Sequence, residues 1–132
     1  MRLNPPTLAA MISHFEQSLP FECCGLLAGS GNQVSFVYPL TNDQASAVAF
    51  TIAPAEHFGA WRHAEANGWE LIGAFHSHPS GPEQLSTTDI ALAGEPDWVY
   101  VVVTSRGARA FVISDRRAVE IPIEVQTRQV GS

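Results

Sequence analysis

Residues 76–89 read HSHPSGPEQLSTTD, and this stretch holds most of the structural and chemical information in the chain. His76 and His78 are two residues apart, so their side chains project to the same side at the end of an extended segment. Residues 79–82 (PSGP) have the composition of a loop that turns the chain. The stretch therefore predicts a strand that ends in two like-facing imidazoles, followed by a constrained loop.

Asp89 extends this histidine pair to a set of three metal ligands. It lies in the first turn of a helix that we expect over residues 86–93, after the loop. Two imidazole nitrogens and one carboxylate oxygen are three ligands of a tetrahedral site, and the fourth position is left for water, as in catalytic zinc sites. Zinc lowers the pKa of such a water to about 7. Chemistry at this site also needs a base for the water proton and a donor for the developing oxyanion.

The same residues also have ordinary structural interpretations. A His-x-His pair alone is more often two half-exposed side chains than a metal site. Ser86 and Asp89 have the spacing of a capping box, in which the serine oxygen caps a helix N-terminus. The metal site is favoured because two like-facing histidines, a constrained loop, a serine and an aspartate occur together in one order.

Composition limits the classes of function that the chain can have. Its 132 residues are 45% apolar and 15% charged, which predicts one globular domain over residues 1–132. All 7 basic residues are arginine, against 13 acidic residues, for a net charge of −6. Without lysine there is no Schiff base and no Walker-type phosphate loop. The acidic balance argues against nucleic acid as a partner.

Cysteine usage and hydropathy give an expected location. Cys23 and Cys24 are adjacent, which excludes a disulfide scaffold and favours a reducing compartment. No apolar run reaches the ~20 residues of a membrane span, and no signal peptide is visible. We therefore expect a cytoplasmic protein without a membrane partner.

Hydrophobic periodicity and turn residues predict an α/β domain with a mixed, antiparallel-rich sheet, rather than the regular βαβ alternation of a doubly wound fold. Helices are expected over residues 5–18, 54–67 and 86–93. Strands are expected over residues 24–29, 33–40, 48–52, 69–76, 99–104, 109–113 and 118–123. Trp61, Trp69 and Trp98 are expected to be core and rim aromatics, and His57 and His63 surface residues.

Together these residues resemble the signature of the JAMM (MPN-plus, or JAB-domain) family of zinc peptidases and isopeptidases. That signature is an upstream Glu, then His-x-His-Pro, a few loop residues and Ser-x-x-Asp, and every element is present. Residues 20–27 (PFECCGLL) also resemble the Glu-x-Cys-Gly-Leu-Leu stretch of the compact prokaryotic branch. The likeness covers about residues 3–123. It implies a curved, mostly antiparallel mixed sheet flanked by helices, related to the cytidine-deaminase fold.

The resemblance implies roles for five residues. His76, His78 and Asp89 would be the ligands of one Zn²⁺ per chain, with a catalytic water. Glu22 would be the general base that takes the water proton and returns it to the leaving amine, and Ser86 would donate a hydrogen bond to the oxyanion. From the residues alone, Glu22 precedes His76 by 54 positions, so spacing does not show that they meet. An acid beside a buried strand is nevertheless costly unless it is used or paired.

The resemblance also implies a substrate. Family members hydrolyse amide or isopeptide bonds next to the C-terminal glycines of ubiquitin-like proteins. This compact chain resembles members that act on ubiquitin-like sulfur-carrier proteins with a Gly-Gly tail, and such a protein is the expected partner. Apolar strand edges are compatible with a homodimer.

Three other interpretations stay open: a RadC-like JAB domain, a cell-wall or phage-tail JAB peptidase domain, and a non-catalytic MPN scaffold. The Cys-Gly-Leu-Leu context and the complete ligand set favour the peptidase. A zinc deaminase is disfavoured because its Pro-Cys-x-x-Cys ligands are missing.

Overall fold

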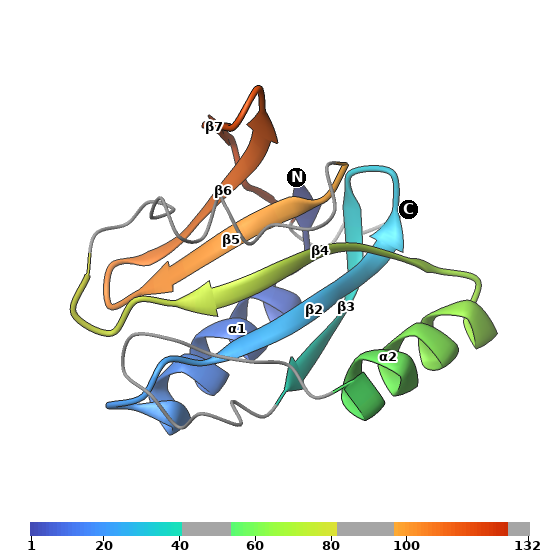
Figure 1. Ribbon diagram of the computed structural model, residues 1–132, viewed down its shortest axis with the longest axis horizontal. Coiled ribbons are helices and arrows are strands. Elements are labelled where there is room, and N and C mark those ends of the chain that lie inside the picture. The colour runs from blue at the N-terminus through green and yellow to red at the C-terminus, as the bar shows by residue number, and fades with distance from the viewer. Residues whose placement is uncertain (41–53, 82–96, 127–132) are drawn as a thin grey trace, which may run out of the picture.

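The computed structural model describes residues 1–40, 54–81 and 97–126 (Figure 1). Within these residues, eight strands form one sheet in the order β7-β6-β5-β4-β2-β3-β1-β8. The helices are α1 (Pro5–Ser18) and α2 (Pro54–Ala66). The strands are β1 (Arg2–Leu3), β2 (Cys24–Ser30), β3 (Gln33–Leu40), β4 (Glu70–Ser77), β5 (Val99–Thr104), β6 (Gly107–Ser114), β7 (Arg117–Ile121) and β8 (Glu124–Val125).

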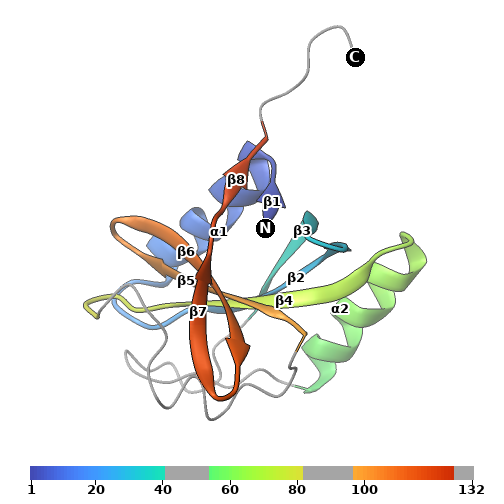
Figure 2. The same ribbon diagram turned by 90° about the horizontal axis from the view of Figure 1, so that it is seen from above.

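The sheet is mixed, and its longest pairings are antiparallel, which confirms the predicted fold class. β2 pairs antiparallel with β3 on one side and with β4 on the other. β4 and β5 are parallel neighbours, and the short strand β1 is parallel to both β3 and β8. Figure 2 shows that the β6–β7 end of the sheet turns strongly away from the direction of β4, so the sheet is curved.

The two helices cover opposite faces of the sheet (Figure 2). Successive residues of a strand point to opposite faces, and Leu26 and Leu27 of β2 do so here. Leu27 joins a cluster that contains Met11 and Phe15 of α1, whereas Leu26 joins a cluster that contains Ala60 of α2. Because both leucines are almost fully buried, β2 is a central strand with apolar packing on both sides.

The α1 helix has the bounds that the sequence predicts, and its start has a clear cause. The side chain of Asn4 caps the helix by accepting a hydrogen bond from the backbone N–H of Thr7 at 3.0 Å. Pro5 and Pro6 occupy the first turn, where a missing N–H costs nothing. The buried residues Met11 and Phe15 lie one turn apart and face the sheet.

Most described elements match their predicted ranges within two or three residues, and the differences have local causes. The strand predicted over residues 118–123 ends instead at Ile121, and Pro122, which follows, has no N–H for the ladder. β1 and β8 were not predicted, because each has two residues and pairs with a distant segment. The strand predicted over 48–52 and the helix predicted over 86–93 lie outside the described residues. No described helix is long and apolar enough to cross a membrane.

Gly25 is a position where the close packing of β2 leaves no room for a side chain. A Cβ atom there would lie 2.1 Å from the Phe75 ring and 2.5 Å from the Tyr38 carbonyl oxygen. The backbone oxygen belongs to the neighbouring strand β3 and cannot move aside without breaking the sheet pairing. Gly25 therefore allows the two strands and the Phe75 ring to meet.

We expect Gly25→Ala to lower the free energy of unfolding by about 1–3 kcal/mol, because overpacking here forces the backbone or Phe75 to shift. The matched control is Gly59→Ala in α2, where nothing lies within 4 Å of the added methyl group. That change should leave stability unaltered or raise it by about 0.5–1 kcal/mol through helix propensity. Chemical unfolding followed by circular dichroism measures both, and equal stability of the two variants would contradict the packing described here.

Candidate metal centre

Three neighbouring strand ends meet at one edge of the sheet. β4 and β5 are parallel, so their carboxyl ends lie together, and β2 runs antiparallel to β4, so its amino end lies at the same edge. In the register, His76 lies opposite Cys24 of β2 and opposite Val102 of β5. Residues just before β2 and residues at the end of β4 are therefore brought together although they are far apart in sequence.

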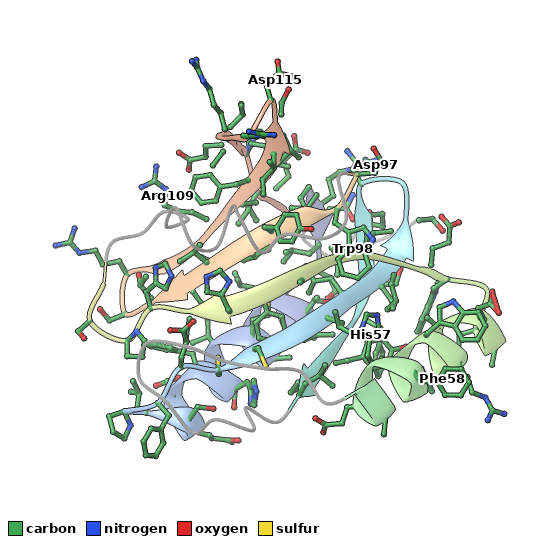
Figure 3. All side chains as sticks on the ribbon, viewed as in Figure 1. His57, Phe58, Asp97, Trp98, Arg109 and Asp115 are labelled. Carbon is green, nitrogen blue, oxygen red and sulfur yellow. The ribbon has the colours of Figure 1, made fainter. Side chains whose placement is uncertain are left out.

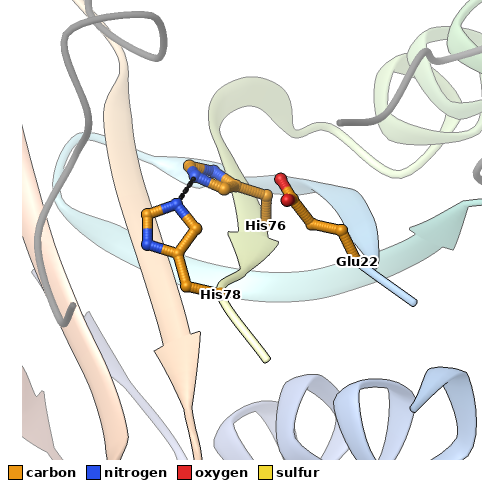
Figure 4. Close-up of side chains that lie close together, drawn as sticks. All are labelled: Glu22, His76 and His78. Atoms are coloured by element: carbon orange, nitrogen blue, oxygen red, sulfur yellow. Dashed lines mark hydrogen bonds between the residues drawn. The ribbon is translucent and has the colours of Figure 1, made fainter. Parts of the chain in front are cut away.

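Strand alternation then selects which side chains share a face. His76 and Cys24 are directly opposite, so their side chains face the same side of the sheet. His78 lies two residues after His76, and Glu22 lies two residues before Cys24, so alternation places both of these side chains on that side as well. Figure 4 shows the result: the carboxylate of Glu22 and the rings of His76 and His78 converge. The prediction that the two histidines project to one side agrees with this arrangement.

The spacing of the three side chains fits a metal ion. One ligand atom from each of Glu22, His76 and His78 lies within 4.8 Å of the others. The two histidine Nε2 atoms are 3.1 Å apart. Two nitrogens bound to a tetrahedral zinc ion at about 2.05 Å would lie roughly 3.3 Å apart. The imidazole pair is therefore close to the geometry that a single zinc ion requires.

The burial of these groups supports the same conclusion. Glu22 is 4% exposed and His76 is 5% exposed. A carboxylate removed from water to this extent is costly unless positive charge or hydrogen bonds compensate for it. A divalent cation held by the neighbouring imidazoles would supply that positive charge.

Ser77, between the two histidines, ties the Glu22 segment to β4. Its hydroxyl oxygen accepts a hydrogen bond from the backbone N–H of Cys23 at 2.8 Å. Its own backbone N–H donates to the carbonyl oxygen of Cys23 at 3.0 Å. Because Cys23 directly follows Glu22, these two bonds fix the position of Glu22 relative to His76. Ser77 is fully buried, so both bonds are shielded from water.

The two cysteines remain structural. Both are buried and neither forms a disulfide. Burial raises the pKa of the Cys23 thiol above its ordinary value, a hydrogen bond with Ser77 offsets part of the increase, and the nearby Glu22 charge adds to it. The Cys23 thiol is therefore held in its neutral form, which is a poor nucleophile and a poor metal ligand.

Ser86 and Asp89 lie outside the described residues, so the structure does not test their predicted roles. The metal ligand and the oxyanion donor that they are expected to provide stay predictions. Of the five residues predicted for the site, the structure describes Glu22, His76 and His78.

A pocket of about 340 Å³ adjoins this cluster on the β5 side and was not predicted from the sequence. It is lined by His78, Pro79, Ser80 and Gly81 after β4, and by Thr104, Ser105 and Arg106 at the end of β5. These two segments are far apart in sequence, and no motif links them. Only the parallel pairing of β4 and β5 reveals that they form one pocket.

Several aromatic and histidine side chains lie on and around α2. Figure 3 shows His57 of α2 near Trp98, and their ring centroids are 6.4 Å apart. His57 and His63 are exposed, as predicted. Trp69 and Trp98 are half-buried rim residues, whereas Trp61 is 44% exposed and lies against Phe58 on the surface of α2.

A comparison of the sequence with protein families points to the same kind of protein as this cluster of side chains. Residues 4–118 match the model of the prokaryotic homologs of the JAB domain. The chain belongs to this family. The predicted family membership is thus confirmed over most of the chain.

Characterised relatives support this membership. The CysO-cysteine peptidase of Mycobacterium tuberculosis is 32% identical, and the match covers 88% of this chain and 84% of that protein. The desampylase of Pyrococcus furiosus is 33% identical, with 80% of this chain and 76% of that protein covered.

Solved structures share the fold. A protein of Desulfitobacterium hafniense, known from its solution structure, superposes with a TM-score of 0.85 at 32% identity, covering 98% of this chain and 94% of that one. A JAB1/MPN domain protein of Archaeoglobus fulgidus superposes with a TM-score of 0.65 at 20% identity, covering 95% of this chain and 98% of that one. The fold of this family member is therefore the JAB/MPN fold.

We expect Ser77→Ala to lower the free energy of unfolding by about 1–3 kcal/mol, because it leaves the buried N–H of Cys23 without its side-chain acceptor. Ser114→Ala is the matched control, since Ser114 is exposed at the opposite end of the sheet, and it should change stability by less than about 0.5 kcal/mol. Thermal and chemical unfolding measure both variants. A Ser77→Ala protein as stable as the control would show that this hydrogen bond does not hold the segment.

Proposed function

We propose that this chain is a zinc-dependent peptidase that cleaves the amide bond after the C-terminal Gly-Gly of a ubiquitin-like sulfur-carrier protein. The observation that carries the proposal is the convergence of Glu22, His76 and His78 at the shared edge of β2, β4 and β5. A buried carboxylate beside two imidazoles is a combination that a metal-dependent hydrolase needs and that a structural core does not.

The assignment as a peptidase rests on the family to which the chain belongs. The matched relatives are named as a peptidase and a desampylase, which confirms the prediction that the chain is a metallopeptidase or isopeptidase. The name CysO-cysteine peptidase supports a substrate in which a small residue is joined to a carrier protein. The Gly-Gly tail and the identity of the metal belong to the proposal.

Each residue of the proposed site has a chemical task. His76, His78 and Asp89 hold the zinc ion, which when bound lowers the pKa of a water molecule to about 7. Glu22 accepts the proton of the attacking water and returns it to the nitrogen of the leaving group. The hydroxyl of Ser86 donates a hydrogen bond to the carbonyl oxygen as negative charge develops there.

The burial of the site supports a glycine tail as the group that enters it. His76 and Glu22 are nearly inaccessible to solvent, so a substrate carbonyl must approach them closely. Glycine has no side chain and adopts conformations that other residues avoid, so a Gly-Gly segment can reach the ligands without steric conflict.

We expect the purified chain to bind one zinc ion, and His78→Ala to lose it, because the variant removes one of three protein ligands. His57→Ala is the matched control, since His57 is an exposed histidine on α2. Elemental analysis after equilibrium dialysis gives the zinc content of each protein. Full zinc content in His78→Ala, or none in the unaltered chain, would refute the metal assignment.

The reaction itself is tested with zinc-loaded protein and small sulfur-carrier proteins that carry one to several residues after Gly-Gly. We expect trimming to a Gly-Gly end, measured by intact-mass spectrometry. Glu22→Gln should keep its zinc and lose at least about 10²-fold in turnover, because the amide cannot take up the water proton.

Two results would overturn different parts of this proposal. A fully active Glu22→Gln protein would show that another group is the base. Failure of the zinc-loaded chain to trim any carrier would keep the metal site but remove the proposed substrate, and would favour the RadC-like or cell-wall interpretations.

A further inference from the structure

We propose that the pocket beside His78 binds the α-carboxylate of the amino acid that the reaction releases, with Arg106 as the group that recognises it. This inference rests on the proposed function and names the leaving group that the site prefers. It predicts that the chain acts on a carrier protein extended by one terminal amino acid better than on an isopeptide with a lysine side chain.

The pocket lies directly against a proposed metal ligand. His78 is one of its lining residues, and its backbone N–H donates to the carbonyl oxygen of Val103 at 3.0 Å, which joins the end of β4 to β5. The opposite wall comes from the turn that follows β5, including Thr104 and Arg106. A volume of about 340 Å³ is at the small end of ligand pockets and accommodates an amino acid.

Local hydrogen bonds and close packing fix the backbone that forms the walls of the pocket. The backbone N–H of Arg106 donates to the hydroxyl oxygen of Thr104 at 3.1 Å. Thr104 pairs with Gly107 in the β5–β6 ladder, so Ser105 and Arg106 form a tight two-residue turn. On the other wall, a Cβ atom at Gly81 would lie 3.1 Å from the Cβ of His78, so the absence of a side chain there lets the loop pass close to the ligand.

The chemistry of the lining favours an anion. Among the described residues that line the pocket there is one arginine, three hydroxyl side chains and no carboxylate, in a chain whose net charge is −6. The planar guanidinium of Arg106 can bind both oxygens of a carboxylate, and hydroxyl groups can donate to the same oxygens.

The leaving group must satisfy a simple distance requirement. In a free α-amino acid, one carbon atom separates the nitrogen released by cleavage from the carboxylate. The group that binds this carboxylate must therefore adjoin the metal ligands, as the Arg106 pocket does through His78. In an isopeptide, the released nitrogen is at the end of a lysine side chain, four methylene groups from its backbone, and no carboxylate lies near it.

The test compares two probes: a sulfur-carrier protein extended after Gly-Gly by one alanine with a C-terminal carboxylate, and the same protein with a C-terminal carboxamide. With the unaltered chain we expect KM to be about tenfold lower or more for the carboxylate, because a charge-assisted bidentate contact is lost in the amide. Arg106→Gln should abolish this ratio by raising KM for the carboxylate, while kcat stays nearly unchanged. Arg117→Gln, at the far end of the sheet, is the control and should keep the ratio.

A binding measurement on zinc-loaded Glu22→Gln protein gives a readout that does not depend on turnover. We expect fluorescence anisotropy to show the same preference for the carboxylate probe, and Arg106→Gln in that background to remove it. Equal KM or equal affinity for the two probes, or an unchanged ratio in Arg106→Gln, would overturn the inference while the proposed function stands. Cleavage of neither probe by the unaltered chain would refute the proposed function and, with it, the inference.

Discussion

The antiparallel pairing of β2 with β4 determines where Glu22 and the two histidines lie relative to one another. It places Cys24 opposite His76, and the hydrogen bonds between Cys23 and Ser77 extend the pairing beyond the strand ends. Glu22 is thereby brought to the histidines from 54 positions earlier in the chain. A one-residue slip of this register would move Glu22 to the opposite face of the sheet, so the pairing decides whether the three groups meet at all.

Apolar packing on both faces of β2 stabilises the register of β2 with β4. β2 is buried on both faces, with Leu27 against α1 and Leu26 against α2, and Gly25 allows the Phe75 ring to pack directly against the strand. A rigid scaffold of this kind can hold a buried carboxylate beside two imidazoles, because side chains cannot rearrange to reach water. At the strand ends this packing gives way to the open pocket at His78, so the rigid ligands border a space that a substrate can enter.

Much of the fold could be predicted, since local patterns dominate where elements are long. The helix over residues 5–18 and the strands over 33–40 and 99–104 have the predicted bounds because apolar spacing, prolines and turn glycines mark them clearly. The two-residue strands β1 and β8 carry no periodic signal and exist through pairing with distant segments, as in the hydrogen bond from Arg2 to the carbonyl of Asn32. The exposure of Trp61 was likewise set by how α2 sits on the sheet.

Residue identities alone set the chemistry that is available to this chain. The His-x-His spacing, the absence of lysine and the family signature follow from residue identity and local backbone geometry, which need no knowledge of distant contacts. Folding adds three arrangements that no local pattern reveals: Glu22 faces the histidines, Ser77 holds it there, and Arg106 lies across a pocket from His78. Those contacts join segments that are far apart along the chain. The sheet register creates them, and the combined packing of many residues sets that register.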